Sequence, residues 1–276
     1  MKLHPKSFTG KLYKFYTYDF VQHPGKNRVV SILKRFFKNG IEVIDDETQT
    51  RYILNINDLL CSIILKYGHY EEHSIKIARE ICGDNDGYFL DVGANFGLYT
   101  CYLLSANPKL KSISLDASYI AFAQLLTNIN LNKLNNRVQL SNTALSDSYS
   151  LHFFSPFNES NLGSSRIVSE TSDKSKYVVC STTLNDILAA LKPSQIRLMK
   201  MDVEGHEEYV LNGLDIFGPY RPENILLEYE PINNPEVVKI KNKLIEANYE
   251  VFDVFLNRYS DQEDLPESNL LFKSKK

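Results

Sequence analysis

Residues 88–100 constrain the fold of this chain more than any other stretch. They read YFLDVGANFGLYT: a short apolar run that ends in Asp91, a turn with Gly93 and Gly97, and the start of an apolar helical pattern. This order predicts a buried strand, a tight turn and a helix. Because glycine has no Cβ, a ligand could approach the backbone of the turn, and the free N–H groups of the helix start suit an anionic group. An ordinary strand-turn-helix unit of any α/β protein remains the alternative.

The turn differs from the dinucleotide-binding fingerprint, which requires G-x-G-x-x-G. Asp91 occupies the position of the first glycine, and no third glycine follows at the required spacing. A carboxylate at the end of the strand suits a ligand with an ammonium group better than a pyrophosphate. A nicotinamide-dependent enzyme is therefore a weaker alternative, and the ligand that raises the melting temperature would distinguish the two.

The composition limits the class of protein. The chain has 276 residues, of which 43% are hydrophobic, so it can bury a sizeable core. Its net charge of −3 gives no broad electrostatic reason to bind nucleic acid or an anionic membrane. The four cysteines lack C-x-x-C spacing, which is typical of reduced thiols in the cytosol. Without a signal peptide or an apolar run of spanning length, we expect a cytoplasmic protein with no membrane span.

Residues 1–82 are expected to form an N-terminal extension of helices and a hairpin that partly covers the site. Residues 1–40 are basic and aromatic. They could bind a nucleic-acid strand, but packing on the main domain, or on a second subunit of a homodimer, is the favoured interpretation. Residues 29–37 are predicted to form an amphipathic helix, 41–56 a hairpin, and 58–81 a helical region. Residues 69–73 fit the H-x-x-E-H pattern of some zinc peptidases, although solvated histidines are favoured because Gly68 marks a helix boundary.

Residues 83–276 are expected to form one α/β domain. A turn-forming cluster at 83–87 marks its start, and strand and helix patterns alternate beyond it, which predicts a mostly parallel, seven-stranded sheet with helices on both faces. Strands are predicted at 88–92, 112–115, 138–140, 197–201, 225–228, 249–255 and 270–272. Helices are predicted at 98–106, 119–131, 184–191, 207–217 and 236–247. Residues 158–176, which are rich in Ser and Asn, are predicted to form a long loop of the kind that often closes over a site.

The ends of five predicted strands carry polar residues. Ligands of open α/β sheets bind at the carboxyl ends of the strands. The first strand ends in Asp91, and the second leads to Asp116, a carboxylate that could accept hydrogen bonds from both hydroxyls of a ribose. The third leads to residues 142–144, where a nucleobase could lie. The fifth ends in Glu228 and Glu230. The agreement among these strand ends predicts one ligand-binding edge.

The fourth strand alternates charged and apolar residues. Lys200, Asp202 and Glu204 alternate with Met201 and Val203, so a strand would place the three charges on one side. Charges in a central strand are costly unless they are paired or functional. Pairing of Lys200 with Asp202 or Glu204 is the alternative to a catalytic role. The helix that follows is expected to place Glu207 and Glu208 on the surface.

Several of these stretches resemble the FkbM family of methyltransferases. They are DVGANFG at 91–97, KMDVEGHE at 200–207 and ILLEYE at 225–230, supported by GHYE at 68–71 and TLND at 183–186. The resemblance runs from about residue 68 to 272 and implies a Rossmann-like class I methyltransferase fold with S-adenosylmethionine as methyl donor. It also implies O-methylation of a hydroxyl on a sugar, glycan or natural product. Two positions depart from the family: Asp116 stands where glutamate is usual, and His206 stands where a small residue is usual.

The resemblance and the strand ends together give a hypothesis for the site. Asp202 or Glu204 would act as general base on the acceptor hydroxyl, and Lys200 would orient that base or the acceptor oxygen. No resident metal is expected. Residues that would bind the donor are Glu71, Asp91, Gly93, Asn95, Gly97, Asp116, Ala117, Asn142 and Ala144.

Two other functions fit the same residues. A cluster of acids at 202, 204, 228 and 230 could hold a divalent cation that binds the acceptor oxygens. Alternatively, the chain could be a non-catalytic module that binds the donor within an assembly. The expected partner is a small-molecule or glycan acceptor whose identity the sequence leaves open.

Overall fold

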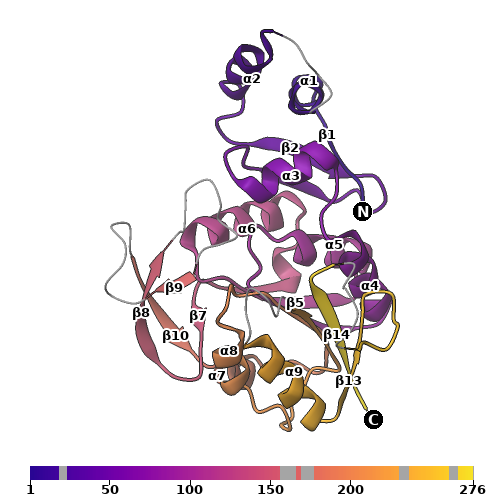
Figure 1. Ribbon diagram of the computed structural model, residues 1–276, viewed down its shortest axis with the longest axis vertical. Helices are drawn as coiled ribbons and strands as arrows, with labels where there is room; N and C mark the ends of the chain where they lie inside the picture. Colours follow the sequence, from indigo (N-terminus) through magenta and orange to yellow (C-terminus); the bar gives the residue numbers. More distant parts are fainter. Residues whose placement is uncertain (19–23, 156–165, 169–176, 230–235, 261–266, 276) are drawn as a thin grey trace.

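The computed structural model describes residues 1–18, 24–155, 166–168, 177–229, 236–260 and 267–275. Its centre is a seven-stranded sheet with the order β13-β14-β12-β11-β4-β5-β6 (Figure 1). The strands of this sheet are β4 (Gly87–Val92), β5 (Leu110–Leu115), β6 (Val138–Ser141), β11 (Ile196–Met201), β12 (Asn224–Glu228), β13 (Tyr249–Phe252) and β14 (Asn269–Ser274). All neighbouring pairs from β12 to β6 are parallel, whereas β14 is antiparallel to both of its neighbours. The prediction of a mostly parallel, seven-stranded sheet is confirmed.

Helices cover both faces of this sheet because successive strand residues point to opposite sides. Phe89, Leu198 and Leu226 join one core with α4 (Glu72–Cys82), α5 (Leu98–Ala106) and α6 (Tyr119–Leu131). Leu90 and Met199 join the opposite core with α7 (Leu184–Leu191), α8 (Glu207–Asn212) and α9 (Val237–Glu246). Ser118 and Thr183 cap α6 and α7 by accepting hydrogen bonds from backbone N–H groups three residues later.

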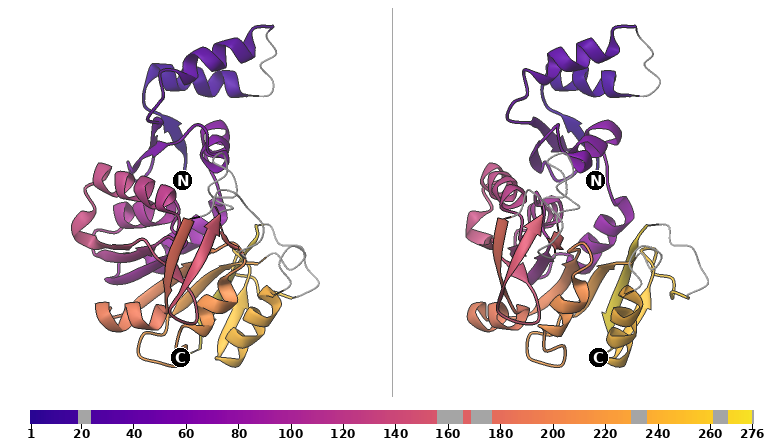
Figure 2. Two further views of the ribbon diagram at one scale, coloured as in Figure 1. Left: turned by 90° about the vertical axis from the view of Figure 1, so that its left-hand side faces the viewer. Right: turned by 60° about the vertical axis from the view of Figure 1, so that its left-hand side comes forward.

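A second sheet, which the sequence analysis missed, packs beside the first. Its order is β7-β10-β8-β9, formed by Ala144–Leu145, Tyr177–Thr182, Ser150–Ser155 and Arg166–Val168 (Figure 2). Strand β9 lies inside the stretch predicted as a long loop, so that prediction is wrong for residues 166–168; the rest of the stretch between β8 and β10 lies outside the described residues. Two elements are also shorter than predicted. Helix α8 ends at Asn212 instead of residue 217, and β13 ends at Phe252 instead of residue 255.

The N-terminal residues form a small antiparallel sheet and a pair of helices. Strands β1 (Leu3–Pro5), β2 (Ile41–Asp45) and β3 (Arg51–Leu54) make the sheet, and α1 (Phe8–Thr17) and α2 (Lys26–Lys34) lie beyond it at one end of the molecule (Figures 1 and 2). The helical region predicted at 58–81 is two helices, α3 (Leu59–Tyr67) and α4, separated at Gly68, which adopts a left-handed conformation with φ of 85°.

The small sheet is tied to α6 by side-chain amides. The outward N–H groups of Arg51 and Ile53 on β3 donate to the carboxamide oxygens of Asn132 and Asn128, both at 2.8 Å. The Tyr52 hydroxyl of β3 donates to the carbonyl of Leu98 at 2.9 Å. The apolar residues of β2 and β3 also belong to the same core as Phe89 of the central sheet. The N-terminal segment and the central sheet therefore share one hydrophobic core.

Candidate donor-binding and active site

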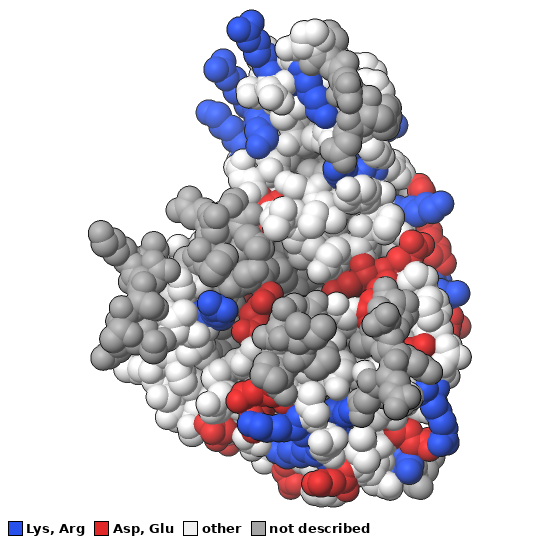
Figure 3. All heavy atoms as spheres, viewed as in Figure 1, with Lys and Arg blue, Asp and Glu red and all other residues white. Residues whose placement is uncertain are grey.

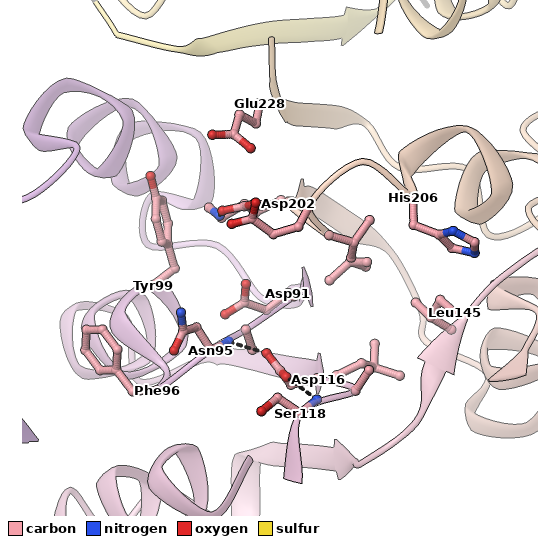
Figure 4. A pocket seen from close by; sticks show the side chains of 18 of the residues that line it. Asp91, Asn95, Phe96, Tyr99, Asp116, Ser118, Leu145, Asp202, His206 and Glu228 are labelled. Carbon is pink, nitrogen blue, oxygen red and sulfur yellow. Dashed lines mark hydrogen bonds and ion pairs between the residues drawn. The ribbon is translucent and has the colours of Figure 1, made fainter. Parts of the chain in front are cut away.

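A cavity lies at the carboxyl ends of β4, β5, β11 and β12 (Figure 4). It encloses about 1090 Å³ of empty space, including its opening to solvent. Asp91, Asp116, Asp202 and Glu228 line it, each from the end of a different strand or the residue beyond (Figure 4). The strand ends singled out in the sequence therefore meet in one cavity.

The glycine turn after β4 packs tightly against the end of β11. Gly93 has a φ of 81°, and a Cβ added to it would lie 1.8 Å from the carbonyl oxygen of Asp202. The N–H groups of Gly93 and Ala94 both donate to the carbonyl of Leu115, at 3.0 and 2.9 Å. A glycine is thus required at 93 by close backbone contact as well as by conformation. Gly97 lies outside the lining of the cavity, and a Cβ on it would meet the Leu125 side chain at 2.5 Å.

Asp91 is held at the base of the cavity. Its carboxylate is only 1% exposed and accepts a 2.5 Å hydrogen bond from the Thr100 hydroxyl, which also contacts the Ser114 hydroxyl at 2.7 Å. Burial raises the pKa of Asp91 to about 6, although the positive charge of Lys200 acts in the opposite direction. The site therefore contains a desolvated acid at the position where a cationic ligand group would be stabilised.

Asp116 is oriented by two backbone N–H groups. Asn95 donates to one carboxylate oxygen at 2.7 Å and Ser118 to the other at 2.8 Å (Figure 4). Burial raises the pKa of Asp116 to about 6, against these two hydrogen bonds, which lower it. The neighbouring Ala117 also lines the cavity.

The segment after β6 contributes to the same region. The Asn142 carboxamide donates to the carbonyl of Asp116 at 2.7 Å, so it fixes the loop rather than lining the cavity. Thr143, Ala144 and Leu145 form the wall beside it. Of residues 142–144, which were expected to border the adenine, Thr143 and Ala144 are part of the wall and Asn142 is not.

Lys200 and Asp202 form a buried ion pair. Lys200 is 5% exposed, and its ammonium lies 2.8 Å from an Asp202 carboxylate oxygen and 5.0 Å from the centre of the Tyr99 ring. Burial acts to lower the pKa of Lys200, but the surrounding Asp202, Glu71 and Asp91 carboxylates outweigh it and raise the pKa above its ordinary value. The pairing that the sequence left open is therefore present between these two residues.

Glu204 lies on the loop that follows β11. Its backbone is left-handed, with φ of 55°, and Gly205 follows with φ of 90°. Glu204 as a whole is exposed, but partial burial of its carboxyl group and the nearby Asp202 and Glu207 raise its pKa to about 8. A non-glycine residue in this conformation is strained, and such strain is concentrated at functional sites.

Glu207 stabilises the same loop from inside the protein. It is 2% exposed and accepts hydrogen bonds from the N–H groups of Val203 and Gly205, both at 3.1 Å. The prediction that Glu207 lies on the surface is therefore wrong. It failed because a glutamate in the first turn of a helix gives no sign in sequence of whether it faces solvent or folds back onto the preceding loop.

Other residues of the cavity were missed or not assigned a position. Glu71, predicted from the resemblance, lines it with a left-handed backbone and accepts a 2.6 Å hydrogen bond from the Tyr99 hydroxyl. Burial raises the pKa of Glu71. Tyr99 gave no signal, because it lies within an apolar helical run. Phe154 and Ile167 reach the cavity from the second sheet, where the apolar pair at 153–154 was the available clue.

His206 forms a further part of the wall. Its Nε2 lies 3.1 Å from the Ser146 hydroxyl, and its ring stacks on Tyr209 with centroids 4.5 Å apart. Burial, together with the nearby His152, lowers the pKa of His206 to about 4. At neutral pH this wall residue is uncharged.

The histidines of the H-x-x-E-H pattern lie outside the cavity. His69 is 3.9 Å from Glu72, and His73 contacts Glu267 at 3.0 Å. Among the described residues, no group of three or more His, Cys, Asp or Glu side chains is placed to hold a metal ion. Glu230, part of the proposed acidic cluster, lies outside those residues. Within the same part of the chain, no helix is long and apolar enough to cross a membrane.

Comparison with solved structures gives matches at low sequence identity. The methyltransferase FkbM from Methylobacillus flagellatus KT is 12% identical over 96% of this chain and 58% of that chain, with a TM-score of 0.47. This chain therefore spans less than two thirds of that protein's length. The O-methyltransferase from Bacillus cereus in complex with SAH is 13% identical over 74% of this chain and 80% of that chain, with a TM-score of 0.43. No curated protein matches the sequence.

The comparison with family patterns is more specific. The methyltransferase FkbM domain matches residues 91–251, which is more than half of the chain and includes the carboxyl ends of β4, β5, β6, β11 and β12. The match begins at Asp91 itself. The chain therefore belongs to the FkbM family of S-adenosylmethionine-dependent methyltransferases.

Proposed function

We propose that this chain transfers the methyl group of S-adenosylmethionine to a hydroxyl oxygen of an uncharged acceptor, such as a sugar, a glycan or another natural product. The observation that carries the proposal is that the acids suited to the donor, Asp91 and Asp116, line the same cavity as the acids suited to proton transfer, Asp202 and Glu204. A donor and an acceptor could therefore meet inside it.

The residues at one end of the cavity suit the donor. Each Asp116 oxygen already accepts one backbone N–H and retains a lone pair for a ribose hydroxyl. Asp91 offers a buried carboxylate to an ammonium group, and Ala144 and Leu145 offer an apolar wall to a base. When bound, the donor supplies the electrophilic methyl group. The protein supplies alignment, which can contribute about 7–11 kcal/mol in well-oriented reactions.

Glu204 is the favoured general base. An alcohol must lose its proton as its oxygen forms the new bond to carbon, and a base works best when its pKa is near the operating pH. The pKa of Glu204 is about 8, whereas Asp202 is engaged by Lys200 at 2.8 Å. We assign proton acceptance to Glu204 and orientation of the acceptor oxygen to the Lys200–Asp202 pair.

The charges of the cavity favour an uncharged acceptor. Within the described part of the chain, six acids line it, against a single lysine that is already paired. The acids are Glu71, Asp91, Asp116, Asp202, Glu204 and Glu228. His206 adds no positive charge at neutral pH, since its pKa is about 4. Glu204, with a pKa of about 8, is mostly uncharged at that pH, so the negative charge comes from the other acids. Bringing a phosphate or carboxylate into such a site would add like-charge repulsion in a partly desolvated space, so anionic acceptors should be poor substrates.

The test uses the purified chain, a methyl-labelled donor and two acceptor pools. We expect label to enter neutral polyhydroxylated compounds and to be much reduced with the corresponding sugar phosphates. Gene deletion followed by mass spectrometry should reveal a metabolite or glycan lighter by one methylene group. Preferred methylation of the phosphorylated pool would contradict the charge argument. Donor binding without any product from either pool would favour the non-catalytic binding module, and loss of activity with a strong chelator would favour the cation-dependent reaction.

A further inference from the structure

The N-terminal helices concentrate positive charge that the rest of the chain lacks. Residues 1–40 contain nine Lys or Arg residues and one acid, Asp19, whereas the whole chain has a net charge of −3. Figure 3 shows Lys and Arg side chains projecting from the end of the molecule formed by α1 and α2. Residues 41–276 therefore carry an excess of acids, so the N-terminal segment and the rest of the chain have net charges of opposite sign.

Five of the nine basic side chains of residues 1–40 have no partner within the described part of the chain. Among the described residues, Lys11, Arg28, Lys34, Arg35 and Lys38 make no ion pair or side-chain hydrogen bond. In residues 41–276, by contrast, many basic side chains form ion pairs with acids. Arg51 pairs with Glu42, Arg197 with Glu223 and Arg258 with Glu250. The helices thus present a positive surface that no neighbouring carboxylate of the described chain neutralises.

Large apolar side chains lie among these bases. Phe8 is 79% exposed, Phe36 71%, Ile32 55% and Phe15 49%. On α1, the spacing of residues 8, 11 and 15 places two phenylalanines and a lysine on one face. On α2 and its C-cap, residues 28, 32 and 35 likewise place two arginines and an isoleucine on one face. We define the basic–aromatic face as Phe8, Lys11, Phe15, Arg28, Ile32, Lys34, Arg35, Phe36 and Lys38.

The exposed apolar groups are not needed to hold the helices together. Tyr13, Leu33 and Phe37 are buried between α1, α2 and the small sheet, and the Tyr13 and Phe37 rings meet edge to face with centroids 5.8 Å apart. Ser7 caps α1 by accepting a hydrogen bond from the Gly10 N–H. The inner faces of these helices therefore pack into the hydrophobic core that they share with the central sheet, whereas Phe8, Ile32 and Phe36 stay mostly exposed.

We infer that the basic–aromatic face docks on an anionic phospholipid surface. Amphipathic helices that combine Lys and Arg with Phe and Leu bind in the interface of the bilayer, where apolar groups enter the acyl boundary and bases meet the headgroups. Nucleic acid would complement the charge, but it offers no apolar layer for an isoleucine on the same face as two arginines. The inference does not depend on the proposed methyl transfer, and it places the chain at a membrane surface without crossing it.

The test is co-sedimentation of the full chain with vesicles of phosphatidylcholine alone and of phosphatidylcholine mixed with phosphatidylglycerol. We expect partitioning onto the anionic vesicles only, and weaker partitioning as salt screens the charges. Each base near an anionic surface contributes roughly fivefold to partitioning, so the triple change Lys34→Gln, Arg35→Gln and Lys38→Gln should reduce it by about a hundredfold. The matched control, Lys109→Gln, Lys133→Gln and Lys192→Gln on the body, should leave it unchanged.

A second variant tests the apolar contribution separately. Phe8→Ser with Phe36→Ser changes two side chains that are already mostly exposed, so the fold should persist, and circular dichroism would verify it. Partitioning of this variant should fall by more than tenfold. Failure of the folded wild-type chain to bind anionic vesicles would overturn the inference. So would equal losses in the two triple variants, tight binding of an oligonucleotide in place of vesicles, or a dimer in light scattering that buries Phe8 and Phe36.

Discussion

Replacing Asp116 with alanine tests the assignment of the donor site most directly. The two carboxylate oxygens are held by the N–H groups of Asn95 and Ser118 at 2.7 and 2.8 Å, which leaves one lone pair on each for a ribose hydroxyl. A hydrogen bond to a charged group contributes about 1.5–3 kcal/mol. Loss of two such bonds therefore amounts to about 3–6 kcal/mol, or roughly a 10²–10⁴-fold rise in the Kd for S-adenosylhomocysteine.

The assay is isothermal titration calorimetry with S-adenosylhomocysteine and with its 2′,3′-dideoxy analogue. Wild-type protein should bind the analogue much more weakly than the parent compound, whereas Asp116→Ala should bind the two almost equally. Asp116→Glu retains the carboxylate and serves as the control, because it should keep most of the discrimination. If the alanine variant bound the parent compound as tightly as wild type, or still discriminated between the two ligands, Asp116 would not contact the ribose.

Three further predictions concern Glu204, Asp91 and Gly93. Glu204→Gln should slow transfer by about 10²–10⁴-fold and leave the donor Kd unchanged. Wild-type activity should rise with pH and level off above about 8, because the base must be ionised, and the variant should lose this inflection in its pH–rate profile. Burial raises the pKa of Asp91 from 3.8 to about 6, so its ionisation opposes folding, with no cost below pH 3.8 and the full cost above pH 6. Asp91→Asn should therefore stabilise the protein at pH 8 by on the order of 1–3 kcal/mol but not at pH 3.8 or below, measured by denaturant unfolding; a lower stability at pH 8 would contradict the argument. Gly93→Ala, whose Cβ would lie 1.8 Å from the Asp202 carbonyl oxygen, should lower the free energy of unfolding by about 3 kcal/mol or more. The control Gly205→Ala has open space around its Cβ and should lower it by only about 1–2 kcal/mol. Equal melting temperatures of the two variants would refute the packing role of Gly93.

The central part of the fold could be predicted because its local signals agree with its tertiary environment. Helices α5, α6 and α7 have the bounds that the sequence pattern predicted, and in the structure Ser118 and Thr183 cap α6 and α7. Strands β4 and β12 contain the apolar runs YFL and ILL, as expected for strands buried on both faces. The carboxyl ends of the central strands, with Asp91 and Asp116, were therefore the best-predicted part of the site.

The second sheet could not be predicted for a physical reason. Its strands are short and half exposed: Leu151 is 70% and Val178 56% exposed, so the alternation of buried and polar positions is weak. The contribution of Tyr99 was also hidden, because its ring lies in an apolar helix while its hydroxyl bonds to Glu71 from a distant segment. Such a contact depends on how two elements pack, which local sequence patterns do not encode.

The amides of α6 have a consequence for the stability of the whole chain. The carboxamide oxygens of Asn128 and Asn132 accept the outward N–H groups of β3, which a neighbouring strand would otherwise bind, so this edge is closed to pairing with another polypeptide. Since β3 also shares its apolar core with Phe89, removing the first eighty residues would strip one face of α6 and expose the interior of the remainder. We therefore expect one cooperative thermal transition for the intact chain, and aggregation of a shortened chain that lacks the first eighty residues.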